Sequence, residues 1–255
     1  MTSPKIISVV RDFNMYERCL RKNPNAEGCD LVPIDNRRTN DHIGTCYNRA
    51  LDSIDPTKPT WLIFCHEDFE PQEPLTEVLS GLDPTAIYGP IGAITVRRFG
   101  IYYQWHLVGT IEESAKSGQD VGLVGTNTKR GTQADTLDCQ CLIVHSSLIE
   151  KYHLRFDENL SFDLYAEDFC IMAKERHGIP SIIVPFKCHH WSKGSVQARY
   201  FTQLNYLNAK WPNAAYTGTA TQLIGGGGSI LWRSEVAVKR LIQRLTRRAL
   251  GLVSA

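Results

Sequence analysis

Short apolar runs alternate with helical patterns over the first third of the chain. Residues 6–10 and 31–34 are apolar, β-branched runs and predict strands. Residues 15–22 predict a short helix, and residues 43–54 place apolar side chains on one face of an amphipathic helix. Residues 60–65 are continuously apolar, as in a strand covered on both faces. This order predicts an α/β fold with a mostly parallel central sheet flanked by helices.

The pattern is less regular further along. Further strands and a longer helix are expected at 87–96, 137–144 and 181–186, and at 166–178. Ser146 and Ser147 resemble the cap of a short helix. In residues 97–136 the apolar residues do not recur at a helical or strand spacing, and we expect an irregular segment there.

The C-terminal region has a different character. Four consecutive glycines at 225–228 suggest a hinge, which would end a main domain at 1–224. Residues 236–255 then carry an apolar helical stripe among basic side chains, so residues 225–255 are predicted to be a hinge followed by a basic amphipathic helix.

Composition narrows the function classes. The chain has 255 residues, of which 42% are hydrophobic, so it is long enough to bury a sizeable core. Its net charge of +1 argues against a general nucleic-acid binder. Two parts of the chain have opposite net charge. Residues 233–248 hold six basic residues and one acidic residue, and the rest of the chain holds 22 basic and 26 acidic residues. The sequence shows neither a signal-peptide core nor a bilayer-spanning run, and we expect a cytoplasmic protein.

Polar residues follow the predicted strands where a ligand would bind. His66, Glu67 and Asp68 come directly after the third strand, and Asp12 and Asp35 end the first two. In parallel α/β sheets, ligands bind outside the carboxyl ends of the strands. Sparse oxygen ligands of this kind suit a divalent cation bound to a diphosphate, although an acidic turn without a ligand has the same pattern.

Two later clusters add candidate chemistry. Glu167 and Asp168 open a strongly apolar helix, where they serve either as helix-capping acids or as proton acceptors. His190 lies with His189 and Trp191 after a predicted strand. A single histidine in such a place is more often structural than a ligand.

Taken in order, these clusters resemble a known family signature. A strand-end H-x-D, an acidic pair near residue 167 and a histidine about 22 residues later resemble the motifs of inverting, nucleotide-sugar-dependent glycosyltransferases of the GT-A fold, the family-2-like group. The resemblance extends over about residues 5–195. It implies a nucleotide-sugar-binding half at 1–96 and an acceptor and catalytic half at 97–224.

The resemblance implies a role for individual residues of the donor and metal sites. Asp68 matches the metal-binding acid of the family's D-x-D motif, while His66 replaces its usual first acid, and His190 matches a later histidine that completes the metal shell. The implied cofactor is Mn²⁺ or Mg²⁺, and the partner a nucleoside-diphosphate sugar. The remaining donor-site residues implied in this way are Asp12, Asp35, Asn48 and Glu67.

The resemblance also implies a mechanism. Asp168, with Glu167 beside it, matches the general base that would activate an acceptor hydroxyl for a single, inverting displacement. Trp105, His106 and Trp191 are acceptor candidates, because aromatic faces pack against sugar rings. A glycan or lipid-linked acceptor and polysaccharide biosynthesis are expectations from the family alone.

Other readings remain open at this stage. A sugar-nucleotide nucleotidyltransferase would use a similar core, but it should have a glycine-rich basic loop where this chain has residues 11–14. A non-catalytic sugar- or nucleotide-binding module on a degenerate GT-A fold is the second alternative. The basic tail further predicts peripheral attachment to an anionic membrane surface, on the inner face of a membrane.

Overall fold

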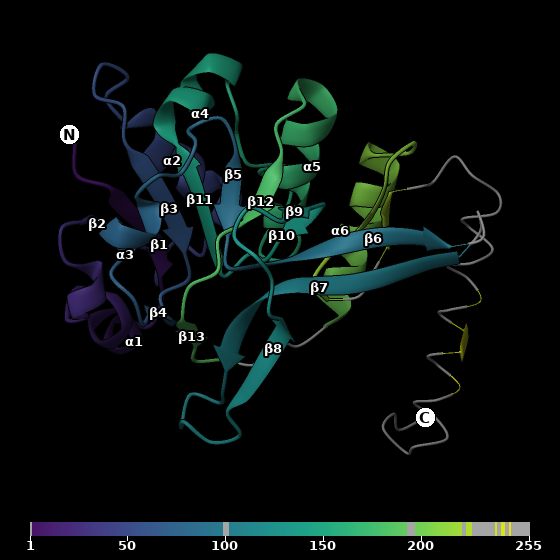
Figure 1. The fold of residues 1–255 in the computed structure, drawn as a ribbon, viewed down its shortest axis with the longest axis horizontal. Coiled ribbons are helices and arrows are strands. Elements are labelled where there is room, and N and C mark those ends of the chain that lie inside the picture. The colour runs from purple at the N-terminus through teal and green to yellow at the C-terminus, as the bar shows by residue number, and fades with distance from the viewer. Residues whose placement is uncertain are drawn as a thin grey trace.

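A seven-stranded sheet forms the centre of the fold, and a six-stranded sheet crosses beside it (Figure 1). The structure is a computed structural model that describes residues 2–98, 102–192, 197–220 and 223–225, with Val238, Leu241, Ile242 and Leu245. Side chains at 97, 98 and 102–105 lie outside this description. In spatial order, the central sheet consists of β2 (Asp30–Asp35), β1 (Lys5–Val10), β3 (Trp61–Cys65), β11 (Cys141–His145), β5 (Ile87–Gly89), β12 (Ser181–Ile183) and β9 (Gln133–Ala134).

The first three strands of this sheet are parallel, as the β–α repeats predict. β1 pairs in parallel with both β2 and β3, whereas β11 runs antiparallel to β3. Side chains alternate along β1, so that Ile7 and Val9 enter one core while Ile6 and Val10 enter the other. The sheet is therefore buried on both faces.

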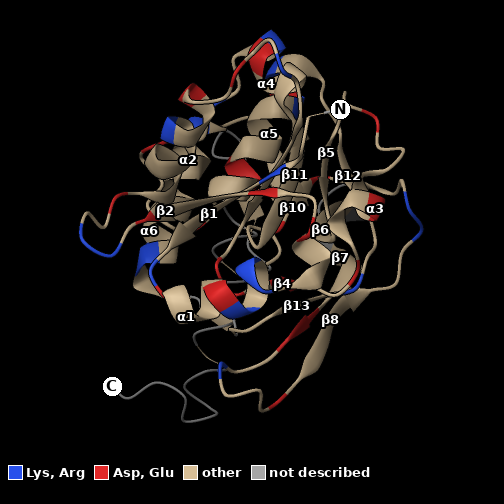
Figure 2. Cartoon of the chain, turned by 90° about the vertical axis from the view of Figure 1, so that its left-hand side faces the viewer, with Lys and Arg blue, Asp and Glu red and all other residues tan. Residues whose placement is uncertain are grey.

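Helices cover those two faces. The helical segments are α1 (Phe13–Tyr16), the π-helical turn η1 (Glu17–Arg21), the short 3-10 turn η2 (Pro24–Ala26), α2 (Ile43–Asp52), α3 (Leu75–Leu79), α4 (Ser146–Tyr152), α5 (Tyr165–His177) and α6 (Ala198–Lys210). Apolar residues of α2, α4, α5 and α6 share one core, and those of α1, η1 and α3 share the other. Figure 2 shows both charge signs on η1, α2 and α4.

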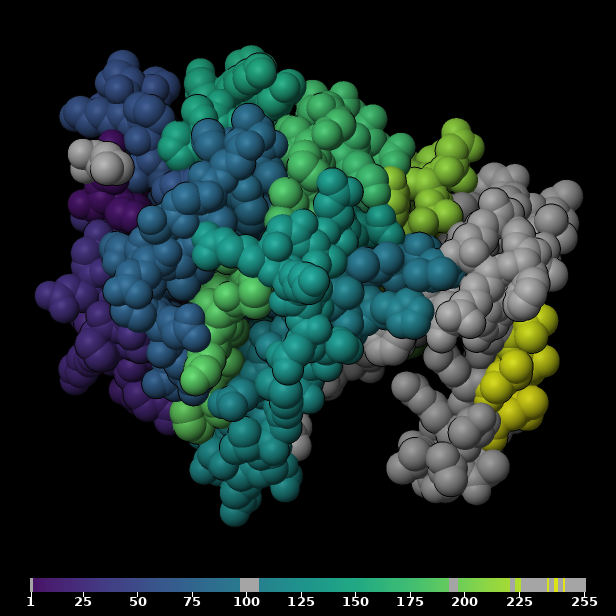
Figure 3. All heavy atoms as spheres, in the orientation of Figure 1, coloured from purple at the N-terminus to yellow at the C-terminus, as the bar shows by residue number. Residues whose placement is uncertain are grey.

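The second sheet contains the largest departure from the sequence prediction. It consists of β10 (Thr136–Leu137), β6 (Ile91–Arg98), β7 (Tyr102–Glu113), β13 (Cys188–His190) and β4 (Phe69–Pro71), with β8 (Gly122–Thr126) paired to β7. Residues 97–136 are thus not irregular, because β6, β7 and β8 form an antiparallel meander. Figures 1 and 3 show the β7–β8 hairpin extending from the body of the molecule.

The expected strand at 87–96 is two strands in different sheets. Pro90 separates β5 from β6, and the chain leaves the central sheet there. Gly109 makes the crossing possible: its φ is +78°, and a Cβ there would lie 2.0 Å from the carbonyl oxygen of Pro90. The expected strand at 137–144 is likewise divided into β10 and β11, with residues 138–140 between them.

The C-terminal region differs in detail from the expectation. Helix α6 was not predicted, and it is followed by a small hairpin of β14 (Ala215–Thr217) and β15 (Leu223–Gly225). Gly225 is therefore not in a hinge but pairs with Ala215. Residues 226–228 and most of the predicted tail helix lie outside the described residues, whereas Val238, Leu241, Ile242 and Leu245 are helical and exposed. Among the described helices, none has the length and apolarity needed to cross a bilayer.

Candidate active site

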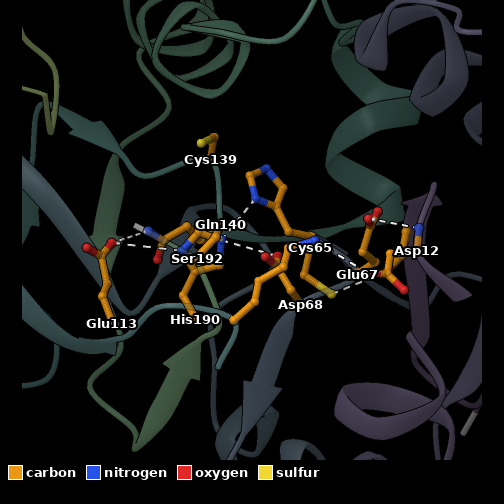
Figure 4. A network of polar contacts seen from close by, with 12 residues as sticks. Asp12, Cys65, Glu67, Asp68, Glu113, Cys139, Gln140, His190 and Ser192 are labelled. Atoms are coloured by element: carbon orange, nitrogen blue, oxygen red, sulfur yellow. Dashed lines mark hydrogen bonds and ion pairs between the residues drawn. The ribbon is translucent and has the colours of Figure 1, made fainter. Parts of the chain in front are cut away.

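Two neighbouring strands bring the histidine and carboxylate candidates together. His66, Glu67 and Asp68 occupy the turn between β3 and β4. β13 pairs antiparallel with β4 so that His190 faces Phe69, and the Trp191 amide donates to the Asp68 carbonyl oxygen. This pairing joins two segments that are far apart in the sequence and sets His190 beside Asp68 (Figure 4).

His66, Asp68 and His190 form a three-donor cluster. His190 Nε2 lies 3.2 Å from Asp68 Oδ1 and 3.4 Å from His66 Nδ1. One ligand atom from each residue falls within 4.8 Å of the others. Two imidazole nitrogens and one carboxylate oxygen form a donor set that fits a borderline divalent ion such as Mn²⁺, whereas Mg²⁺ prefers oxygen ligands and water.

Hydrogen bonds orient the His66 ring for such a role. The Tyr165 hydroxyl donates to the Cys139 carbonyl oxygen at 2.7 Å, so its oxygen is left to accept from His66 Nε2 at 3.2 Å. The Nε2 proton leaves the lone pair on Nδ1, which faces His190. The ring is therefore held in the tautomer that a metal ligand needs.

Burial and charge set the ionisation of the cluster. Burial and the neighbouring His190 lower the pKa of His66 to about 4. Burial works to lower the pKa of His190, but the hydrogen bond that His190 donates to Asp68, together with the nearby Glu113 carboxylate, raises this pKa to about 9. The same His190 contact holds the pKa of Asp68 below its usual value, against the opposing effect of burial. Without a cation, the cluster is thus a neutral His66 beside an Asp68–His190 ion pair.

Glu67 joins the ends of β1 and β3. Its carboxylate accepts from the backbone amides of Arg11 and Asp12 at 3.2 and 3.1 Å (Figure 4). Asp12 in turn caps α1, where its side chain accepts from the amides of Asn14 and Met15. Glu67 is therefore fixed at the strand ends, as the parallel sheet predicts.

A first cavity of about 470 Å³ opens on the β1–β2 side of the cluster. His66, Glu67 and Asp68 line it, together with the cationic side chains of Arg11 and Lys116. Further polar and aromatic lining comes from the segment after β2 and the start of α2, namely Asn36, Asn40, Asp41, His42 and Tyr47. Its position outside the carboxyl ends of β1 and β3 is the usual ligand position in such sheets.

A second cavity of about 420 Å³ lies on the other side of the cluster. His66 lines both cavities, and Phe162, Ser192 and Arg199 also border both. Acidic side chains of Glu113, Asp138 and Glu167 line the second cavity. The cluster thus lies between two cavities of similar size.

Glu167 and Asp168 have opposite environments. Glu167 lines the second cavity and is 4% exposed, and its Oε2 has no hydrogen-bond partner among the described residues. Burial, with the charge of Asp138, raises the pKa of Glu167 to about 8. The carboxylate oxygens of Asp168 instead accept from Lys210 Nζ and Trp211 Nε1, both at 2.7 Å. Asp168 does not line either of these two cavities.

Three predicted donor-site residues also lie away from the first cavity wall. Asp12 is occupied as the helix cap, and exposed Asp35 pairs with Arg37 at 2.6 Å. Asn48 accepts from the Phe156 amide and donates to Glu158. Asp12 and Asp35 thus stabilise local turns, and Asn48 joins α2 to the segment around Phe156; none of the three lines the first cavity. Of the predicted donor residues, Glu67 alone borders it.

Of the predicted acceptor aromatics, the two with described side chains, Trp191 and His106, do not line the second cavity. Trp191 stacks on His189 and lies under the Arg18 guanidinium, and its indole donates to Glu70. His106 is exposed on β7, and the Trp105 side chain lies outside the described residues. The second cavity is lined instead by residues that the sequence did not single out, including Asp138, Gln140, Tyr200 and Arg199.

Comparison with known proteins identifies the fold. No family model matches the sequence, and no curated protein matches it. The structure of S. aureus TarS 1–349 in complex with UDP superposes with a TM-score of 0.51 at 11% identity, over 84% of this chain and 66% of that one. The chain has the GT-A fold.

A second solved structure with the GT-A fold is GalNAc-T7 with UDP, GalNAc and Mn²⁺. It matches with a TM-score of 0.49 at 12% identity, over 83% of this chain and 48% of that one. The chain therefore spans about half to two thirds of these two proteins. At such identities the likeness establishes the GT-A fold alone.

Proposed function

We propose that this protein transfers a sugar from a nucleoside-diphosphate sugar to a hydroxyl group of a glycan or lipid-linked acceptor. The supporting observation is that His66, Asp68 and His190 lie between two cavities and that His66 borders both. A group-transfer enzyme needs such an arrangement, because two substrates must meet at one polar centre. The GT-A fold makes a nucleotide-sugar donor the natural partner of the first cavity.

The first cavity suits the nucleoside diphosphate. Arg11 and Lys116 give it cationic groups for phosphate oxygens. Tyr47 and the segment around Asn36 supply the wall for the nucleoside. Asn36 is held in place because its side chain bonds both the amide and the carbonyl of Asp41.

His66, Asp68 and His190 would hold the divalent cation, and the donor set favours Mn²⁺ over Mg²⁺. When bound, the cation neutralises the charge that develops on the leaving diphosphate. To serve as a ligand, His190 would have to be deprotonated, and Tyr165 keeps His66 Nδ1 directed at the site. Both histidines are supported by other side chains, as ligands in metal sites usually are.

Glu167 is proposed as the general base. The acceptor hydroxyl oxygen forms a bond to the anomeric carbon, its proton passes to the Glu167 carboxylate, and the bond to the diphosphate oxygen breaks with its electron pair. A single displacement of this kind inverts the anomeric centre. General-base assistance of this type contributes about 10²- to 10⁴-fold to the rate.

The proposal is tested with the full chain, Mn²⁺ and a panel of nucleotide sugars, by measuring release of the nucleoside diphosphate with and without acceptor sugars. We expect release with one class of donor and its loss in Asp68→Asn. Asp30→Asn is the matched control, because Asp30 is exposed on β2 and pairs with Lys5. Nucleotide binding without release from any donor would favour a non-catalytic module and overturn the proposal.

We further propose that the C-terminal segment attaches the protein to an anionic membrane surface. Val238, Leu241, Ile242 and Leu245 are spaced as one helical stripe, and each is more than half exposed. Six basic residues lie within 233–248. An apolar face with flanking bases suits an anionic lipid surface and would bring a lipid-linked acceptor near the site.

Vesicle sedimentation tests this attachment. Deletion of residues 233–255 should abolish binding to vesicles with anionic lipid, while nucleotide binding by the first cavity is retained. A control that changes the six bases to glutamine should weaken binding in low salt in particular. Unchanged vesicle binding by the deletion variant would contradict the proposal.

A further inference from the structure

Buried polar atoms without protein partners concentrate on the second cavity. Six such side-chain atoms occur among the described residues. Four of them belong to residues that line this cavity: Gln140 Oε1, Glu167 Oε2, His190 Nδ1 and Tyr200 OH. Buried polar groups are normally hydrogen-bonded, so their concentration here indicates a wall that a polar ligand completes.

Another part of the lining is apolar. Ile91, Leu107, Ile111 and Val124 line the cavity from β6, β7 and β8. Ile111 lies opposite Val124 in the β7–β8 register, so the two side chains share one face of the hairpin. A ligand with hydroxyl groups and a C–H face matches a cavity lined by both kinds of side chain, and a pyranose ring has that form.

The charges of the lining have one predominant sign. Glu113 and Asp138 bring carboxylates, and Gln140 is fixed between them, because its side chain donates to Glu113 and its amide donates to Asp138. Two cations belong to this lining, and each is paired with a carboxylate: Arg199 with Asp163 at 2.6 Å and protonated His190 with Asp68 at 3.2 Å. An anionic ligand would meet carboxylates here without a free cation from the described lining.

We infer that the second cavity binds an uncharged, hydroxyl-rich sugar ring and excludes sugars that carry a carboxylate or phosphate. This inference rests on the proposed function, because it names the substrate class of the same site. A bound cation would add positive charge, but the donor diphosphate in the first cavity would offset it. The carboxylates of the second cavity then set the preference.

Ligand-observed saturation-transfer NMR on the full-length protein tests the preference. The probes are methyl β-glucoside, methyl β-glucuronide and glucose 6-phosphate, which differ mainly in charge. We expect the glucoside to bind at least about tenfold more tightly than either anion in low salt, with a smaller ratio in high salt. An anionic probe that binds as tightly as the glucoside would overturn the inference.

Adjacent positions on β8 offer a matched pair of variants. Val124 faces the second cavity, whereas Leu123 is on the other face of the strand and is 63% exposed. Val124→Trp fills the cavity and should abolish glucoside binding, while Leu123→Trp should leave it within about twofold. Equal binding by both variants would place the sugar elsewhere and overturn the inference.

The sugar in the second cavity is either the acceptor sugar or the transferred sugar, and the inference holds for both. Adding UDP or UDP-glucose distinguishes the two. With Mn²⁺ present, a glucoside displaced by UDP-glucose but not by UDP occupies the position of the transferred sugar. A glucoside retained with either nucleotide occupies the acceptor position. Failure of UDP and Mn²⁺ to bind at all would count against the proposed function, whereas the charge preference of the second cavity is measured without them.

Discussion

The Tyr165 hydroxyl fixes the direction of the His66 ring from behind. Its oxygen lies 3.2 Å from His66 Nε2, while its proton is committed to the Cys139 carbonyl. Tyr165 belongs to α5 and His66 to the turn after β3, so a helix on one face of the sheet controls a side chain at the edge. In the proposed metal site, metal affinity would therefore depend on the packing of α5.

Tyr165→Phe should weaken Mn²⁺ binding by about 10- to 100-fold, because the His66 tautomer loses its support. Isothermal titration of the purified protein with Mn²⁺ measures this. Tyr88→Phe is the control, since the Tyr88 hydroxyl bonds the backbone of Asp83 far from the cluster. Equal affinities in the two variants would show that the hydroxyl does not orient His66.

His66→Asp should shift the metal preference toward Mg²⁺. The change replaces an imidazole by an oxygen ligand, and Mg²⁺ favours oxygen ligands. We expect the ratio of the Mn²⁺ to the Mg²⁺ affinity to fall by about tenfold or more relative to the wild type. Competition titrations with both ions provide the measurement, and an unchanged ratio would argue against ligation by His66.

Transfer activity should rise with pH toward about 8. The raised pKa leaves Glu167 mostly protonated at pH 6, and a base must first lose its proton. The ionised fraction grows about tenfold per pH unit below the pKa, and kcat/KM should follow it. Initial rates between pH 6 and 9 at saturating Mn²⁺ test this, and a flat profile over that interval would exclude Glu167 as the base.

The Glu167 carboxyl group should also make the fold less stable as the pH rises. Its pKa is about 8 in the fold against a usual 4.5, so the folded chain keeps a proton that the unfolded chain releases. The contribution of the protonated Glu167 to the free energy of unfolding is complete below about pH 4.5. It is lost as the pH rises to 8, at about 1.4 kcal/mol per pH unit. Glu167→Gln should therefore gain stability over the wild type from pH 5 to 8.

Urea denaturation at several pH values measures that gain. Glu150→Gln, at an exposed position on α4, should show no such trend. If the stability difference between Glu167→Gln and the wild type stayed constant with pH, Glu167 would not hold the proton proposed for it.

Asp168→Asn and Glu167→Gln should have opposite effects. Loss of the Asp168 charge weakens its bonds to Lys210 and Trp211, and we expect a stability loss of about 2 kcal/mol. The folded variant should keep kcat within about threefold, whereas Glu167→Gln should lose about 10²-fold or more. The urea midpoint and kcat of both variants provide the measurement. A large loss of kcat in Asp168→Asn with a small loss in Glu167→Gln would identify Asp168 as the base instead.

The sequence was informative where local pattern determines structure. The strands β1, β2 and β3 and the stripe of α2 follow from apolar periodicity, and His66, Glu67 and Asp68 directly follow β3 as expected. The alternation of apolar and polar residues is not regular after Pro90. The strands β6 and β7, which belong to the second sheet, carry aromatic and polar side chains there. Helix α6 had a usable signal in Tyr200, Leu204 and Leu207, which are buried on one face.

Residue roles were harder to predict because they depend on partners distant in the chain. Glu167 and Asp168 are adjacent and chemically alike, yet Lys210 and Trp211, more than 40 positions away, occupy only Asp168. No local pattern reports that difference. The unpartnered atoms of Gln140 and Tyr200 are likewise visible only after every other residue has been placed.

Pro90 and the pairing of β13 with β4 have a mechanical consequence. His66 follows a strand of the central sheet, whereas His190 belongs to the second sheet. An ion held by both would act as a cross-link between the sheets, and its binding free energy would add to their cohesion. Loading and release of the metal would then stiffen and loosen the seam along which both cavities lie.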